Sequence, residues 1–195
     1  GFGLRGLAQA IRAAGVILQY LQETQPAALK LLGGIATYSL SEFMVLDAAT
    51  RRNLELTETI GGNEGEGSLL SVLDYTVTAM GKRLIRQWVS KPLLNLKQIV
   101  QRQNAVHFLV EDGLLRAELR AALKPLNDLE RLANRVVAGH ATPRDLTAMR
   151  ATLQALPGIY SLFGSPEGPL APALRSINLC EKELQILRAA IADEP

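Results

Sequence analysis

The stretch Val45-Leu46-Asp47-Ala48-Ala49-Thr50-Arg51-Arg52-Asn53-Leu54-Glu55-Leu56 joins a short apolar run to an aspartate and then to a polar turn. Asp47 stands where a helix N-cap belongs, because its carboxylate can accept hydrogen bonds from the free N–H groups at the start of a helix. We therefore predict a helix over residues 48–57. We also expect at most one short strand in the chain, near residues 42–46. Residues 45–56 are called the opening segment below.

A second informative stretch follows a loop with four glycines and two glutamates at residues 61–67. It reads Ser68-Leu69-Leu70-Ser71-Val72-Leu73-Asp74-Tyr75-Thr76-Val77-Thr78-Ala79-Met80-Gly81-Lys82-Arg83-Leu84. Its pattern predicts one helix over about 68–74 and another over 79–90, with Thr78 as the cap of the second. The glycine loop lacks the Lys-Ser/Thr pair of a phosphate-binding loop, and its acids would repel phosphate.

Apolar residues recur at helical spacing along most of the remaining chain. Asn95 with Gln98, and Asn127 with Glu130, have the spacing of a capping box, and Thr142-Pro143 offers a cap followed by proline. The further predicted helices span about 3–25, 95–111, 113–123, 142–156 and 178–192, with one more from about 127; residues 33–41 and 157–172 are predicted as linker and loops. The fold class is therefore all-α, an irregular multi-helix bundle of about eight helices.

These stretches, taken in order, resemble the MutS DNA mismatch-repair family. The opening segment resembles the start of its core (lever) domain, and residues 68–84 resemble the run that follows. Asp128-Leu129-Glu130-Arg131-Leu132 and Pro143-Arg144-Asp145-Leu146 come next in the family's order. Near the N-terminus, Ala13-Ala14-Gly15, Tyr20-Leu21 and Glu23-Thr24-Gln25 resemble the last helix of its connector domain. The resemblance covers most of residues 1 to about 160.

The resemblance implies a domain division and a set of structural residues. Residues 1–33 would be the closing connector helix with a linker, and residues 34–195 the N-terminal part of the core domain. The positions that match the family's pattern are expected to fix packing between elements rather than to perform chemistry. They are Asp47, Thr50, Arg51, Asn53, Leu54, Glu55, Asp74, Thr76, Gly81, Arg83, Pro143, Arg144 and Asp145. The alternative is that the polar residues of the opening segment only cap and solvate one helix.

Charge is unevenly distributed over the 195 residues, although the net charge is only +2. Residues 82–150 hold 13 Lys or Arg and 6 Asp or Glu, a local net charge of +7. Such an excess can attract phosphate groups. Lys82, Arg86 and Lys91 are therefore candidates for a surface that faces DNA. The competing interpretation is an ordinary solvated helix face.

Catalytic and metal-binding patterns are missing from the sequence. Two histidines and the single Cys180 are too few for a typical zinc site, and Cys180 is predicted to be a buried structural thiol. Asp128 and Glu130 lie two apart, so on a helix they do not face each other and form a poor acid/base pair. Trp88 is predicted to lie in the core. We expect no enzyme activity and no cofactor in this chain.

The function that the resemblance implies is mechanical: a lever that couples the ATPase state to the DNA clamp during mismatch repair. The longer protein is expected to be a DNA-dependent ATPase using ATP and Mg, to form a homodimer, and to contact mismatched double-stranded DNA and a MutL-like protein. No membrane span is visible, and we expect a cytoplasmic, nucleoid-associated bacterial protein. Two alternatives are a MutS-like paralogue in recombination control and a free-standing helical scaffold for protein interactions.

Overall fold

The computed structural model describes residues 4, 6–29, 32, 42–61, 66–164 and 167–192. It divides into two compact units, Gly1–Glu42 and Phe43–Pro195. The first unit contains α1 (Ala8–Thr24) and the short α2 (Pro26–Leu29). α1 begins later than the predicted residue 3, and Gly6 just before it has a positive φ of 84° that a helix does not include. The predicted linker at 33–41 lies outside the described residues.

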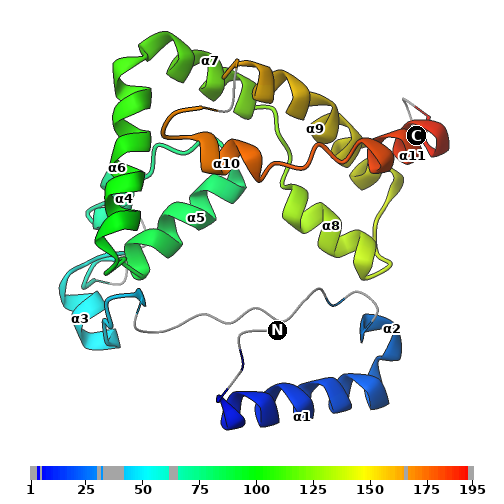
Figure 1. Cartoon of the computed structure of the whole chain (residues 1–195), viewed down its shortest axis with the longest axis horizontal. Helices are drawn as coiled ribbons and strands as arrows, with labels where there is room; N and C mark the ends of the chain where they lie inside the picture. The colour runs from blue at the N-terminus through cyan, green and yellow to red at the C-terminus, as the bar shows by residue number, and fades with distance from the viewer. Residues whose placement is uncertain are drawn as a thin grey trace. The chain divides into compact units, whose positions relative to one another are not determined.

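The second unit is built from helices, which confirms the all-α prediction (Figure 1). They are α3 (Ala48–Asn53), α4 (Leu69–Leu73), α5 (Ala79–Ser90), α6 (Leu96–Glu111), α7 (Gly113–Leu123), α8 (Leu129–Val137), α9 (Pro143–Ser161), α10 (Ala171–Arg175) and α11 (Glu181–Ala190). Within the described ranges, the region of the expected strand forms a single antiparallel bridge between Phe43 and Leu93. The Met44 N–H donates to the Pro92 carbonyl at 2.8 Å beside it.

α9 is the packing centre of the second unit, because α7, α8 and α11 all pack against it (Figure 1). Its buried face includes Leu153, which is 3% exposed, and Ile159. The other close pairs are sequence neighbours, α4 with α5 and α6 with α7. Burial of apolar surface on α9 therefore holds the C-terminal half of the unit together.

The predicted end of α9 at residue 156 is wrong, because the helix continues through Pro157 to Ser161. Proline removes one backbone hydrogen bond from a helix interior. Here the following turn buries Ile159, and that apolar contact offsets the loss. The short α10, at Ala171–Arg175, also lies mostly in the segment predicted as loop.

Two other predicted boundaries are corrected by backbone conformation. α3 ends at Asn53 rather than near residue 57, and Glu55 has a φ of 45°. α11 begins at Glu181 rather than 178, because Cys180 has a φ of 50° in the left-handed region. Cys180 is consequently outside the helix and half-buried, so the prediction of a buried structural thiol is wrong.

Candidate functional site

The opening segment is held by hydrogen bonds within itself. The Asp47 carboxylate accepts a hydrogen bond from the Thr50 N–H at 2.6 Å, which confirms Asp47 as the cap of α3. This bond lowers the pKa of Asp47, with a smaller contribution from the Arg51 charge. Arg51 donates from Nε to the Leu46 carbonyl at 3.0 Å, so its side chain folds back over the start of the segment.

The end of the opening segment pairs with the start of α4. The Leu69 N–H donates to the Glu55 carbonyl and the Leu70 N–H donates to the Leu56 carbonyl, each at 2.9 Å. The Glu55 carboxylate accepts the Ile60 N–H at 2.7 Å. Glu55 thus closes the base of the loop that separates α3 from α4. Asn53 and Leu54, by contrast, are exposed at the helix end.

A second group of family-pattern residues shapes the turn between α4 and α5. The Asp74 carboxylate accepts the Thr76 hydroxyl at 2.5 Å and the Thr76 N–H at 3.1 Å, and the hydroxyl bond lowers the pKa of Asp74. Thr78 caps α5 by accepting the Gly81 N–H at 3.0 Å. A Cβ atom on Gly81 would lie 3.0 Å from the Thr78 hydroxyl oxygen and 3.4 Å from Thr76. Glycine is therefore the residue that lets α5 start close to this turn.

Replacing Gly81 by valine is expected to destabilise the chain by about 1–3 kcal/mol, because the branched side chain overpacks against Thr76 and the capping hydroxyl. Gly158 in α9 is the matched control, since a Cβ there meets nothing within 4 Å. Gly158→Ala should stabilise by up to about 1 kcal/mol through helix propensity. Urea denaturation of both variants measures the difference, and a Gly81→Val protein as stable as the parent would contradict the packing argument.

Arg83 connects α5 to the first turn of α8. Its Nη1 donates to Asp128 Oδ2 at 2.5 Å, and its Nη2 donates to Asp128 Oδ1 at 2.8 Å and to Glu130 Oε2 at 2.5 Å. Asp128 is also the cap of α8, accepting the Arg131 N–H at 3.3 Å. The Arg83 guanidinium is the main reason that the pKa of Asp128 falls to about 2. Arg83, Asp128 and Glu130 are called the Arg83 cluster below.

The sequence pattern singled out both acids of this cluster, but not their contact with Arg83. The two acids do not face each other along a helix, but Asp128 is a cap outside the helix and one guanidinium reaches both. The predicted cap, Asn127, is wrong. Its N–H and side chain instead bind Thr152 Oγ1 at 3.1 and 3.4 Å. No local pattern connects residue 83 with residue 128, so a single sequence offers no signal for the pairing.

The Pro143-Arg144-Asp145 motif starts α9 as predicted. Thr142 and Asp145 form a reciprocal capping box, with Pro143 in the first turn. The Thr142 N–H lies 2.7 Å from Asp145 Oδ2, and this bond lowers the pKa of Asp145. Arg135 of α8 pairs with Asp145 at 3.0 Å, which ties the two helices across their turn. Arg144 is exposed beside them.

Two buried polar residues of α9 were not predicted. Arg150 Nη1 donates to the Ile191 carbonyl at 2.7 Å, so it holds the segment after α11. Thr152, which is 2% exposed, accepts from Asn127 and donates to the Ala148 carbonyl at 2.9 Å. Both side chains join elements far apart in the sequence. The site as a whole consists of hydrogen bonds and ion pairs that join one helix or segment to another.

The family model of MutS domain III matches residues 49–195, a range that contains the Arg83 cluster and most of the opening segment. The chain belongs to the MutS domain III family. It is 46% identical over 196 aligned residues to the DNA mismatch repair protein MutS of Alkaliphilus oremlandii, covering 100% of this chain and 22% of that protein.

The corresponding proteins of Symbiobacterium thermophilum and Synechococcus elongatus give similar values. The first is 45% identical over 100% of this chain and 22% of its own length, and the second 48% identical over 91% and 20%. The resemblance inferred from the motifs is therefore confirmed. The chain spans about one fifth of the length of these MutS relatives.

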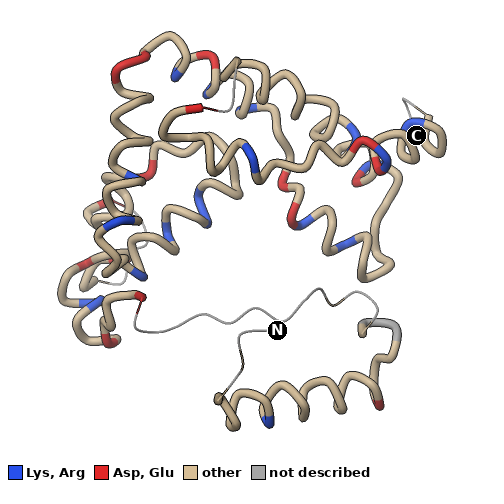
Figure 2. The backbone as a smooth tube through the Cα atoms, in the orientation of Figure 1, with Lys and Arg blue, Asp and Glu red and all other residues tan. Residues whose placement is uncertain are grey.

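The three candidate DNA-facing residues of this MutS domain III chain lie along or just beyond α5. Lys82, Arg86 and Lys91 are exposed, and α5 itself carries no Asp or Glu (Figure 2). Trp88 lies on the same helix and is 37% exposed. The prediction that it lies in the core is therefore wrong. The Arg102 guanidinium covers Trp88, 3.8 Å from the ring centroid, and thereby occupies one face for stacking.

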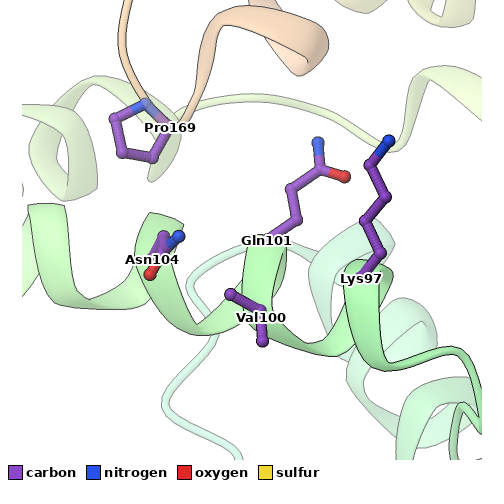
Figure 3. Close-up of a pocket in the computed structure, with 5 residues that line it drawn as sticks. All are labelled: Lys97, Val100, Gln101, Asn104 and Pro169. Atoms are coloured by element: carbon purple, nitrogen blue, oxygen red, sulfur yellow. The ribbon is translucent and has the colours of Figure 1, made fainter.

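An open groove of about 300 Å³ lies on α6 beside the segment that precedes α10 (Figure 3). It is lined by Lys97, Val100, Gln101, Asn104 and Pro169, which include one cation, two amides and no acid/base pair. Among the described residues, no cluster of three or more His, Cys, Asp or Glu is placed to hold a metal. In the same residues, no helix combines the length and apolar character needed to cross a membrane.

Proposed function

We propose that this chain is a non-catalytic mechanical element of a DNA mismatch-repair protein, linking nucleotide state to DNA clamping. The observation that carries the proposal is its membership of the MutS domain III family, together with the ties that cross between helices. Coupling between distant sites requires elements that move as units between discrete arrangements. Three side chains make such contacts between segments that do not belong to the same helix, namely Arg83, Arg150 and Thr152.

ATP and Mg are assigned in this proposal to other parts of the longer protein. The described residues do not fit such a site, because they offer no metal-binding cluster and the sequence has no phosphate-binding loop. The longer protein would be a DNA-dependent ATPase, homodimeric, and a partner of mismatched duplex DNA and a MutL-like protein. We also propose a cytoplasmic, nucleoid-associated location, in keeping with the single cysteine and the bacterial relatives.

Exposed apolar side chains support a role within a larger assembly. Val45 is 86% exposed and Tyr75 is 77% exposed, and Leu96 and Leu114 are likewise exposed. Large apolar residues in such numbers favour burial against further polypeptide. A free-standing scaffold would keep fewer of them in water. The repair branch is favoured over a recombination paralogue because each of the three relatives named above is a mismatch-repair MutS.

Fluorescence-anisotropy titration of the purified chain with heteroduplex and matched DNA, together with an ATPase assay, tests this function. We expect no hydrolysis and at most weak, salt-sensitive binding that does not distinguish the mismatch. Tight, mismatch-selective binding would contradict a mechanical role.

The basic residues of α5 can be tested in the same titration. Lys82, Arg86 and Lys91 are each expected to neutralise one phosphate if they face DNA. Changing all three to glutamine should then make the negative slope of log K against log salt shallower by about 3. The control is the pair Lys182→Gln and Arg188→Gln on α11, both exposed and distant in sequence. The control removes two charges and the α5 variant three, so the losses are compared per charge; an equal loss per charge would assign the basic residues of α5 to an ordinary solvated surface.

A further inference from the structure

α5 and α8 belong to different packed groups of helices. α5 packs on α4, while α8 packs on α9, and α5 and α8 are not among the closely packed pairs of the described chain. The space between their axes is bridged by polar side chains. The Arg83 cluster joins α5 to α8, and Arg120 of α7 donates to the Tyr75 carbonyl at 2.7 Å near the turn before α5.

We infer that the Arg83 cluster is a releasable contact: while it is formed, α5 is fixed to α8, and when it breaks, α5 and α8 can move apart while the Arg120–Tyr75 and Arg102–Trp88 contacts remain. The inference deepens the proposed mechanical role by naming the place where this domain can flex. It rests on that role for its biological meaning, but the contact itself is a property of this chain. Arg83 is therefore a positioning residue.

The geometry makes the contact both specific and breakable. A guanidinium that binds one carboxylate through two nitrogens and a second carboxylate through one of them fixes direction as well as distance. The side chains remain partly in water, with exposures of 37% for Arg83, 15% for Asp128 and 67% for Glu130. Salt screens ion pairs of this kind, whereas it has little effect on the apolar packing around α9.

Protonation of Asp128 weakens the cluster only in acid. The Asp128 carboxylate faces the cations Arg83 of α5 and Arg131 of α8, and it shares Arg83 Nη2 with the Glu130 carboxylate. Asp145 of the neighbouring α9 is paired with Arg135. The folded pKa of Asp128, about 2, lies below its ordinary value of 3.8. Its contribution is thus complete above the ordinary value and disappears as pH falls through about 2. Near neutral pH, salt is the variable that opens the contact.

Hydrogen–deuterium exchange of the 195-residue chain at neutral pH and two salt concentrations tests the inference. In the parent chain, raising salt from about 0.05 to 0.5 M should speed exchange of amides 74–83 and 124–132 by about two- to fivefold, as expected for a partly exposed ion pair. Exchange in residues 150–160 and 181–190 should stay constant. Salt-independent exchange in the first two windows would overturn the inference.

Asp128→Asn is the decisive variant, because asparagine caps a helix as well as aspartate but carries no charge. It should already exchange about two- to fivefold faster in both windows and show a weaker salt response, because the pair between Arg83 and Glu130 remains. Lys82→Gln, an exposed neighbour of Arg83, is the matched control and should retain the full salt response. Faster exchange confined to the first turn of α8 would indicate a lost cap only and overturn the inference.

Arg83→Gln provides a second variant that leaves the α8 cap intact. It removes both ion pairs of the cluster, so it should abolish the salt response, and adding Asp128→Asn to it should cause no further acceleration if both act through one contact. Additive effects would contradict a shared contact. The proposed mechanical role has a separate readout, the coupling of ATP to DNA release in the longer protein. If Arg83→Gln left that coupling unchanged in the longer protein while the salt response held here, only the mechanical role would be contradicted.

Discussion

Leu153→Ala is expected to lower the free energy of unfolding by about 2–5 kcal/mol, the range for a large-to-small change in a packed core. Leu153 is buried on α9, the helix against which α7, α8 and α11 pack. The substitution removes apolar contacts and leaves a cavity on the buried face of α9. Urea denaturation followed by far-ultraviolet circular dichroism measures the change.

Gln154→Ala is the control for this prediction. Gln154 is the next residue on α9 and is exposed, so its truncation should change stability by no more than about 0.5 kcal/mol. Equal losses in the two variants would show that α9 is sensitive at every position, and that its role as packing centre is not carried by its buried face. If Leu153→Ala lowered the free energy of unfolding only slightly, the interpretation of α9 as the packing centre would be contradicted.

Thr152→Val is expected to cost about 1–3 kcal/mol, although the two side chains have nearly the same shape. The hydroxyl of Thr152 accepts the Asn127 N–H at 3.1 Å in a part-buried position. Valine leaves that donor without its acceptor, and the desolvated N–H group is what makes the change unfavourable. The same denaturation experiment reports it.

Thr152→Ser separates the hydroxyl from the methyl group. Serine keeps the acceptor for Asn127, so most of the stability lost in Thr152→Val should return, apart from about 1 kcal/mol for the missing methyl. If serine were as destabilising as valine, packing of the methyl group and not the hydrogen bond would explain the position.

Local features of this fold were predictable because their physics is local. Asp47, Thr78, Asn95 and Thr142 all cap helices as predicted, since each accepts the N–H three residues further along the chain. Apolar periodicity located the helices for a similar reason. Cys180 shows the limit: it continues an apolar stripe, but its left-handed backbone places it outside α11.

The contacts between elements were not predictable from one sequence. Arg83 was singled out through the family pattern, yet its partners are 45 and 47 positions away. Trp88 was predicted to lie in the core because it shares an apolar helix face with Met80 and Leu84, whereas Arg102 one helix later covers it. Arg150 resembled one more cation of a basic segment, but it is buried against carbonyl groups after α11. The exposure and bonding of such residues depend on their tertiary partners, and apolar periodicity contains no information about those partners.

The spacing of two contacts also has a consequence for how the chain folds. Arg83 to Asp128 and Tyr75 to Arg120 each join residues 45 positions apart. The two spans overlap over residues 83–120, a range that contains most of α5, all of α6 and most of α7. Closing either loop brings the ends of the other together, so the entropy of loop closure is lost only once. The local pair α6 and α7 should therefore form first, and both long-range contacts should appear in one later kinetic step.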